Sequence, residues 1–403
     1  MNDALYDTLF YGYYFDEDPK LPRYVYEGIR SEEFNGEDKN DLVSEGIGRF
    51  RGAIEEKIDE QEGEMSQHVV PLSGGLDSRA VLSGLLEYNA IEDEEITTIT
   101  FGSPGTWDYE IGQTVADHAG VKNVAVNLAT VTWSEERLSE YFAKHRPRSR
   151  VLESYLNYIA LTEAIDARGL ENPTIWSGFL GETLAGNHLP KEASDSWEEA
   201  ISYFTEFNRF VDRATLPEEY DPKNRLPSEP YIDPESVRFE DQLDLAVRQQ
   251  YFTRPIIEQG GFDYVQPFKH PHVLSFYLNL PEEYRLKRTL TKEMFLEMDR
   301  ELFSLPSTAT NGLGLHRHWM LGLANKALIK VKTRVTGLNH PNMNYVDFEA
   351  LLESEESVRV LIEREHRYLE SNTRLELQSL DQETSTKYLR SILVASSVHR
   401  SFH

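Results

Sequence analysis

Residues 73–78 read Ser-Gly-Gly-Leu-Asp-Ser, a run that combines residue types that bind phosphate with one acid that would repel it. Two adjacent glycines let the backbone turn tightly and bring its N–H groups close to an anion. A helix that begins there adds the positive end of its dipole. Asp77 fits this chemistry if a divalent cation bridges its carboxylate to the phosphates. The run therefore predicts a phosphate site that uses a metal ion.

The flanking residues predict the strand and the helix that would hold this run in place. Val69 and Val70 form a short apolar segment before it, and Leu82 and Leu86 recur at helical spacing after it. A strand, a glycine turn and a helix in this order can cradle a phosphate group. The lysine of the Walker-type phosphate loop is absent, so the turn is of another kind.

This hexapeptide resembles the pyrophosphate-binding loop of the ATP pyrophosphatase superfamily. With Pro71 and Leu72 before it, it is most similar to the synthetase domain of asparagine synthetases and β-lactam synthetases. The resemblance implies that ATP and Mg²⁺ adenylate a carboxylate, with release of pyrophosphate, before an amide forms. It implies an ATP site made by Leu72, Ser73, Gly74, Gly75, Leu76, Asp77, Ser78, Phe101, Gly102, Ser177 and Gly178.

A second stretch, residues 176–187, carries the same resemblance. In asparagine synthetases the matching segment reads Ser-Gly-Glu-Gly-x-Asp-Glu, followed two residues later by Gly-Gly. Ser177, Gly178 and Gly186 fall in register with it, and Glu182 takes the place of the family's metal-binding aspartate. The resemblance thus implies that Asp77 and Glu182 hold Mg²⁺ against the ATP phosphates. A solvated loop acid is the alternative for Glu182.

The resemblance continues more weakly in residues 261–270. This segment is similar to the family's Leu-Glu-x-Arg-x-Pro-Phe-Leu-Asp, with Asp263 at the glutamate and Pro267-Phe268 at the Pro-Phe pair. Val265 replaces the family's arginine, and Lys269-His270 replaces its Leu-Asp.

Two departures from the family pattern concern the amide-forming step. Phe179 stands where asparagine synthetases carry a glutamate linked to the ammonia nucleophile, and where β-lactam synthetases carry a tyrosine. Phenylalanine cannot accept a proton, so asparagine is in doubt as the product. The family's Arg-x-Lys pair after Leu305-Pro306 is also missing, and four cations could replace its lysine in space: Lys287, Arg288, Lys292 and Arg317. Lys292 matches the basic residue that opens the next helix of the family, so we take Asp77, Glu182 and Lys292 as the candidate catalytic residues.

Strands and helices alternate along residues 41–190. Apolar patterns predict strands at 69–72, 96–101, 124–126 and 174–176, and helices at 41–60, 108–119, 134–145 and 152–168. This alternation predicts an α/β fold with a doubly wound parallel sheet, which the resemblance specifies as adenine nucleotide α hydrolase-like. The loops after Leu72, Phe101 and Trp176 should meet at the carboxyl edge of that sheet.

We divide the chain into four parts. Residues 1–40 form an N-terminal arm without a helical period, which could be an edge hairpin or a packing arm. Residues 41–190 form the ATP pyrophosphatase-like core. Residues 191–250 read as an acidic insertion, a solvated excursion or a lid over the site. Residues 251–403 form a mostly helical C-terminal region that completes the site.

Composition narrows the functional classes. The chain has 403 residues with 69 acidic and 41 basic side chains, for a net charge of -28. This charge is typical of a halophile's surface, with an ordinary acidic cytosolic protein as the alternative, and it argues against nonspecific nucleic-acid binding. The chain has 0 cysteines, which excludes disulfides and cysteine nucleophiles. Neither a membrane-length apolar run nor a signal peptide is visible, so we expect a cytoplasmic protein with no membrane partner.

The expected activity is that of an asparagine synthetase-like, ATP-dependent carbon–nitrogen ligase acting on a small-molecule carboxylate and an amine or ammonia. Aspartate is the default acid, and an acidic sugar or a peptide carboxylate is the alternative. The cysteine of the family's N-terminal glutaminase domain is absent, so the amine would come from free ammonia, a separate glutaminase partner or another substrate. Two other functions stay open: an RNA-modifying enzyme of the same superfamily, and a non-catalytic ATP-binding scaffold.

Overall fold

The computed structural model describes residues 2–29, 34, 38–60, 67–88, 95–131, 134–145, 149, 151–210, 216–336, 346, 348, 351, 356–373 and 386–401. Its strands are β1 (His68–Pro71), β2 (Ile96–Gly102), β3 (Lys122–Asn127), β4 (Thr174–Trp176) and β5 (Asp263–Val265). The helices before β4 are α1 (Asn2–Tyr11), α2 (Arg23–Gly28), α3 (Lys39–Asp59), α4 (Asp77–Glu87), α5 (Trp107–Ala119), α6 (Glu135–His145) and α7 (Val151–Arg168). Between β4 and β5 lie α8 (Gly181–Leu184), α9 (Trp197–Phe207), α10 (Phe239–Leu243), the π-helix η5 (Asp244–Thr253) and α11 (Arg254–Ile257). After β5 come α12 (Pro271–Asn279), α13 (Glu282–Arg285), α14 (Thr289–Met298), α15 (Arg300–Phe303), α16 (Trp319–Thr336), α18 (Glu356–Asn372) and α19 (Thr386–Ser401).

The five strands form one parallel sheet in the order β3-β2-β1-β4-β5. The predicted α/β class and parallel sheet are therefore confirmed. The fifth strand was not predicted, and it comes from the part of the chain that the sequence suggested would be helical. Asp263 of β5 pairs with Thr174 of β4, so this segment extends the sheet beyond residue 190.

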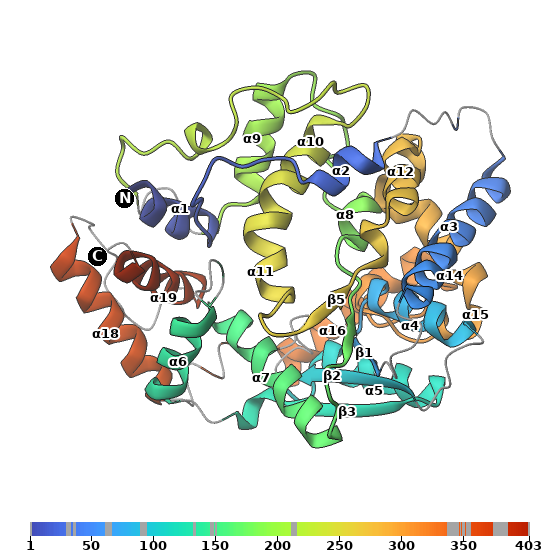
Figure 1. Ribbon diagram of the computed structural model, residues 1–403, viewed down its shortest axis with the longest axis horizontal. Coiled ribbons are helices and arrows are strands. Elements are labelled where there is room, and N and C mark those ends of the chain that lie inside the picture. The colour runs from blue at the N-terminus through green and yellow to red at the C-terminus, as the bar shows by residue number, and fades with distance from the viewer. Residues whose placement is uncertain are drawn as a thin grey trace.

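Helices cover both faces of the sheet because the central strands are apolar on both sides. Val69 packs into the cluster that contains α7, whereas Val70 packs into the cluster that contains α3 and α4. Ile175 and Trp176 of β4 divide between the same two clusters. In Figure 1, α7 lies on one side of the strands, and α3 and α4 lie on the other.

The strand order creates a crevice at one place on the carboxyl edge. The chain runs outward from β1 to β3 and then returns to place β4 on the other side of β1. Loops that leave neighbouring strands in opposite directions open a gap between them, which is where ligands bind in such sheets. The loop at residues 73–78 follows β1 and the loop at 177–182 follows β4, so both of them border this gap.

The described part of the N-terminal arm contains helices α1 and α2 and no strand, so an edge hairpin is wrong for these residues. Helix α1 packs against α19 near the other end of the chain (Figure 1). The Tyr11 hydroxyl donates to the carbonyl oxygen of Pro222 over 2.9 Å, and Tyr13 and Phe15 are buried. A helix buried on most of its sides carries no polar stripe, which is why its sequence shows no helical period.

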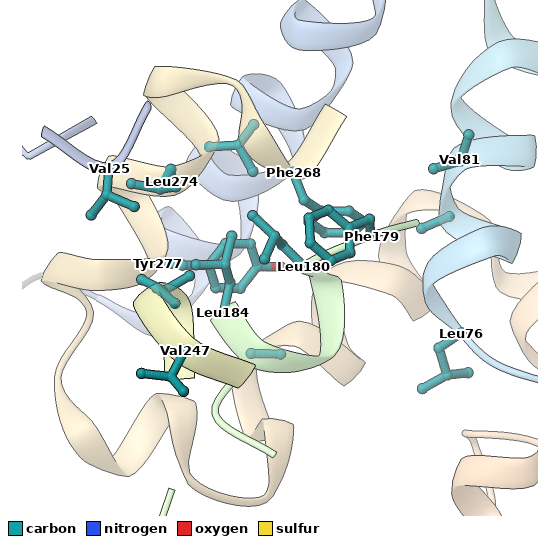
Figure 2. Packing of buried hydrophobic residues seen from close by; sticks show 14 of the residues in the cluster. Val25, Leu76, Val81, Phe179, Leu180, Leu184, Val247, Phe268, Leu274 and Tyr277 are labelled. Atoms are coloured by element: carbon teal, nitrogen blue, oxygen red, sulfur yellow. The ribbon is translucent and has the colours of Figure 1, made fainter. Parts of the chain in front are cut away.

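The helices within residues 191–250 pack into the core, so this part of the segment is not a solvated excursion, whereas most of residues 228–236 are exposed. Helix α9 buries Trp197 and Phe204, and α10 and η5 bury Leu243, Leu245 and Val247. Figure 2 shows Val247 in the same cluster as Leu184. In the part of the chain that the structure describes, we find no helix whose length and hydropathy would let it cross a membrane.

Candidate functional site

A cavity of about 880 Å³ opens at the carboxyl edge of the sheet. Its wall includes the loop after β1, Phe101 of β2 and the loop after β4, as the sequence predicted. Its charged lining residues are two acids, Asp77 and Glu182, and four cations, Arg248, Lys287, Arg288 and Lys292. A chain with a net charge of -28 thus surrounds this cavity with an excess of positive charge, which favours an anionic ligand.

The loop after β1 is held by hydrogen bonds that its own N–H groups donate. The Gly75 N–H donates to Ser73 Oγ over 3.1 Å, and the Gly74 N–H donates to Oδ1 of Asp108 over 2.9 Å. The sequence predicted that Gly74 binds phosphate, but its N–H group already donates to Asp108. Helix α4 begins at Asp77, and the N–H groups of its first turn have no partners within the helix, so these are the backbone donors available to an anion.

Asp108, at the start of α5, holds this loop through a contact that the sequence did not reveal. Burial raises the pKa of its carboxyl group to about 6, although the Gly74 N–H bond opposes the shift. A β-carbon on Gly74 would lie 2.7 Å from Cγ2 of Thr308, so a larger residue here would force its neighbours to shift.

The loop after β4 lies directly on Asp77. A β-carbon on Gly178 would come within 2.7 Å of the Asp77 carbonyl carbon, and one on Gly181 within 2.6 Å of its carboxyl carbon. Between them, Leu180 has a left-handed backbone with φ 74°. Such a conformation costs a non-glycine residue on the order of 1–3 kcal/mol and is held by its surroundings. Figure 2 shows Phe179 and Leu180 among the buried side chains that fix this loop.

Asp77 does not lie on an exposed loop edge, where its position beside a turn would place it. It is the first residue of α4, its side chain is 17% exposed, and Arg288 donates a hydrogen bond to its Oδ1. Burial raises the pKa of Asp77, the charge of Glu182 raises it further, and Arg288 opposes both. Asp77 and Glu182 therefore share one electrostatic environment at the cavity wall.

Two carboxylates do not by themselves make a closed metal site. Among the residues whose positions are described, no group of three or more His, Asp or Glu side chains could hold a metal ion. Glu182 accepts a hydrogen bond from Asn187 over 2.5 Å, and Asp77 is held by Arg288. A divalent cation fits here if phosphate oxygens complete its shell and Arg288 releases Asp77.

Three of the four cations considered for the amide-forming step line the cavity: Lys287, Arg288 and Lys292. Arg317 does not. Lys287 (φ 58°) and Arg288 (φ 60°) have consecutive left-handed backbones, a costly arrangement for two non-glycine residues. Lys292 Nζ donates to the Lys287 carbonyl oxygen over 2.8 Å. Burial lowers the pKa of Lys292, and the charges of Arg288 and Lys287 lower it further.

Phe179 and Lys269 contact each other. Lys269 Nζ lies 5.1 Å from the centroid of the Phe179 ring, which is a cation–π distance. Lys269 also donates to Oε1 of Glu258 over 3.0 Å. The Lys269 cation thus lies against the buried Phe179 ring, which lines the cavity.

Most of the predicted site residues meet at this cavity. Those that line it are Ser73, Gly75, Leu76, Asp77, Ser78, Phe101, Ser177, Gly178, Glu182 and Lys292. Leu72, Gly74 and Gly102 are not among its lining residues. Leu72 and Gly102 are buried beside it, and Gly74 is held by Asp108.

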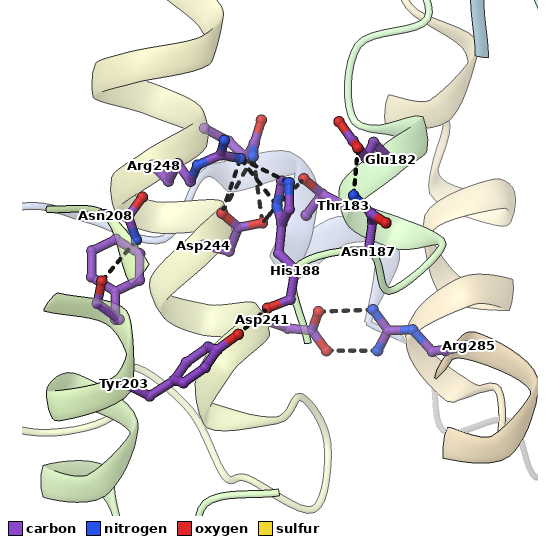
Figure 3. Close-up of polar contacts among 12 residues, drawn as sticks. Glu182, Thr183, Asn187, His188, Tyr203, Asn208, Asp241, Asp244, Arg248 and Arg285 are labelled. Atoms are coloured by element: carbon purple, nitrogen blue, oxygen red, sulfur yellow. Dashed lines mark hydrogen bonds and ion pairs between the residues drawn. The ribbon is translucent and has the colours of Figure 1, made fainter. Parts of the chain in front are cut away.

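The sequence did not predict a cluster formed by His188, Asp244 and Arg248. His188 and Arg248 line the cavity, and buried Asp244, which does not, lies beside both of them in Figure 3. Nδ1 of His188 lies 2.8 Å from Oδ2 of Asp244. Because 56 residues separate the two, no spacing in the sequence could indicate this contact. No protein-family model and no curated protein matches this chain.

Proposed function

We propose that this chain is an ATP-dependent ligase of the asparagine synthetase-like type, which adenylates a carboxylate and then forms an amide. The excess of cations around the cavity, in a strongly acidic chain, carries the proposal. An adenine nucleotide α hydrolase-like fold accords with the strand order and with a glycine turn between β1 and α4. A cavity of about 880 Å³ is large enough for a nucleotide and a small acid.

The described residues divide between the two ends of ATP. The first turn of α4, with Ser73 and Ser78, would donate to the pyrophosphate group. Lys287 and Lys292 would offset the charge that develops as pyrophosphate leaves. Asp77 and Glu182 would hold Mg²⁺, which supplies further charge stabilisation when bound. Phe101 lines the cavity wall that the adenosine would face.

Adenylation requires a balanced exchange at the α-phosphorus. A carboxylate oxygen attacks the phosphorus, the bond to the bridging oxygen of pyrophosphate breaks, and that oxygen keeps the electron pair. Amide formation follows when an amine attacks the acyl carbon and AMP leaves. Phe179 supplies no base for this second step, so the amine must lose its proton to another group. Aspartate is one candidate acid, and an acidic sugar or a peptide carboxylate is another.

ATP–pyrophosphate exchange across a panel of carboxylates, with Mg²⁺ and in high salt, tests the proposal. At least one acid should drive exchange in the wild type. Glu182→Gln should then lower the exchange rate by a factor of about 10²–10³, which is the usual effect of removing one group that stabilises transition-state charge. Its fold should survive because the Glu182 side chain is exposed and its one described hydrogen bond is to Asn187.

Glu192→Gln is the matched control, because Glu192 is an exposed acid outside the cavity lining. Exchange by this control should equal that of the wild type. Tight ATP binding without exchange for any acid would instead favour the scaffold function. Equal exchange rates for Glu182→Gln and the wild type would refute the metal-site assignment.

A further inference from the structure

His188 and Asp244 form a buried pair at the cavity wall. Their side chains are 10% and 8% exposed, and Nδ1 of His188 lies 2.8 Å from Oδ2 of Asp244. Gln249 Nε2 also donates to Asp244, over 3.3 Å. In Figure 3 the imidazole of His188 lies between Asp244 and Thr183. The pair therefore has fixed geometry, with the histidine nearer to the ligand space.

The hydrogen bond determines which ring nitrogen of His188 carries the proton. Burial raises the pKa of Asp244, but His188 and Arg248 outweigh that effect and lower it overall, so the carboxyl group is ionised. An ionised carboxylate only accepts hydrogen bonds, so Nδ1 must be the donor. In the neutral ring the other nitrogen, Nε2, then carries a lone pair that can accept a proton.

Arg248 does not block that lone pair. Its Nη1 lies 3.1 Å from Nδ1 and 3.0 Å from Nε2 of His188. A nitrogen in the ring plane at equal distances from both would collide with Cε1, so Nη1 lies over the face of the ring. The lone pair of Nε2 points outward in the ring plane and is therefore not directed at Nη1, although Nη1 lies within hydrogen-bonding distance of Nε2.

The π-helix is what brings the neighbours of this pair to one surface. A π-helix bonds residue i to residue i+5, so residues four and five apart share a face. Asp244, Arg248, Gln249 and Thr253 are related by these spacings, and the last three line the cavity. In an α-helix, Gln249 and Thr253 would turn away from Asp244. Single turns of this rare winding are frequent at functional sites.

We propose that His188, oriented by Asp244, is the general base for the amine in the amide-forming step. This role rests on the proposed ligase function and supplies the proton acceptor that Phe179 cannot be. As the amine nitrogen bonds to the acyl carbon, one N–H proton passes to Nε2 of His188. The bond from the acyl carbon to the AMP oxygen breaks, AMP keeps the electron pair, and His188 later returns its proton to solvent. Asp244 stabilises the imidazolium that forms between these events.

The test separates adenylation from amide formation on an acid that the wild type accepts. His188→Asn keeps a donor to Asp244 through its amide nitrogen but has no group in place of Nε2. ATP–pyrophosphate exchange should stay within about 2-fold of the wild type, while amide formation should fall by about 10²–10⁴-fold. Hydroxylamine, which is neutral and strongly nucleophilic near pH 7, should still capture the acyl group as a hydroxamate at close to the wild-type rate.

Two further variants complete the design. Asp244→Asn should cause the same selective loss of amide formation, because its amide favours the wrong tautomer of His188. His118→Asn is the control, since His118 is exposed on α5, and it should leave all three rates unchanged.

Either of two results with these variants would overturn the proposal. One is wild-type amide formation by His188→Asn. The other is an equal fall of exchange, hydroxamate and amide rates, which would mark His188 as a structural residue. If none of the acids supports ATP–pyrophosphate exchange by the wild type, the ligase function itself is overturned, and the role of His188 with it.

Discussion

Replacing Arg288 with methionine should destabilise the chain by about 3 kcal/mol, and Mg²⁺ should restore most of the loss. The side chains of Arg288 and Asp77 are only 7% and 17% exposed, and Arg288 donates to Oδ1 of Asp77. Methionine keeps an apolar stem but leaves the carboxylate without its cation. Breaking a buried ion pair by removing one partner costs about 3–5 kcal/mol. Because Asp77 faces the cavity, we expect the lower end of that range.

The metal dependence follows from the same geometry. If Asp77 and Glu182 bind Mg²⁺, the ion supplies the positive charge that Arg288 has lost. A ligand at 100 times its dissociation constant stabilises the native state by about 2.7 kcal/mol, which is nearly the whole expected loss. The wild type should respond less, because Arg288 competes with the ion for Asp77. Urea unfolding of both proteins, without Mg²⁺ and at increasing Mg²⁺, gives the two free energies of unfolding.

The control and the pH response make this prediction refutable. Arg317→Met removes an exposed arginine outside the cavity and should be nearly neutral with or without Mg²⁺. The cost of Arg288→Met should shrink as the pH falls, because burial already raises the pKa of Asp77 and a protonated carboxyl group needs no cation. If Mg²⁺ shifts Arg288→Met and Arg317→Met equally, Asp77 is not a metal ligand.

Two further predictions concern packing and pH. Gly178→Ala should cost about 1–3 kcal/mol and slow pyrophosphate exchange, because its β-carbon would lie 2.7 Å from the Asp77 carbonyl carbon; thermal unfolding and exchange rates check this. Gly48→Ala, with nothing within 4 Å in α3, should instead stabilise the chain by about 0.5–1 kcal/mol. Burial raises the pKa of Asp7 to about 6 despite two 3.0 Å contacts from Arg225. Because the pKa of Asp7 is higher in the folded than in the unfolded chain, the free energy of unfolding falls as the pH rises. Between about pH 4 and about pH 6 the wild type should lose roughly 3 kcal/mol relative to Asp7→Asn, and the difference should then stay level. Urea titrations that show a gain over this range would contradict the prediction.

The sequence predicted those parts of the fold whose signal is local. Strand β4 begins at Thr174 and ends at Trp176, as predicted, and α3 begins two residues before the predicted Asp41. These elements have apolar residues at regular spacing or β-branched runs with clear ends. Strand β5 has only three residues and exists because it pairs with β4. Its identity as a strand depends on that distant partner, which a local pattern does not contain.

The candidate site, too, could be predicted from the sequence only where its residues lie close together in the chain. The loop after β1 could be predicted because its glycines, serines and Asp77 lie together in the sequence. The contact of Asp77 with Arg288 could not, since 211 residues separate them. That contact changes the expected chemistry, because a carboxylate that was predicted to wait for a metal ion already has a cation. A metal ion would therefore have to compete for Asp77, and nucleotide phosphates would have to draw Arg288 away.

The π-helix explains why the sequence did not predict the part of the site formed by Asp244, Arg248, Gln249 and Thr253. Sequence patterns are read at the periods of strands and α-helices, and at the α-helical period Gln249 and Thr253 do not share a face with Asp244. The residues in question belong to a segment whose acidity suggested a solvated surface, yet Asp244 and Gln249 are buried in hydrogen bonds. Their acidity and polarity serve a fixed interior arrangement that orients His188 and not the solubility of the chain. Phe179 offers no base on the loop after β4, whereas His188 lies six residues beyond Glu182 on the same cavity wall, which accords with the proposal that His188 accepts the proton.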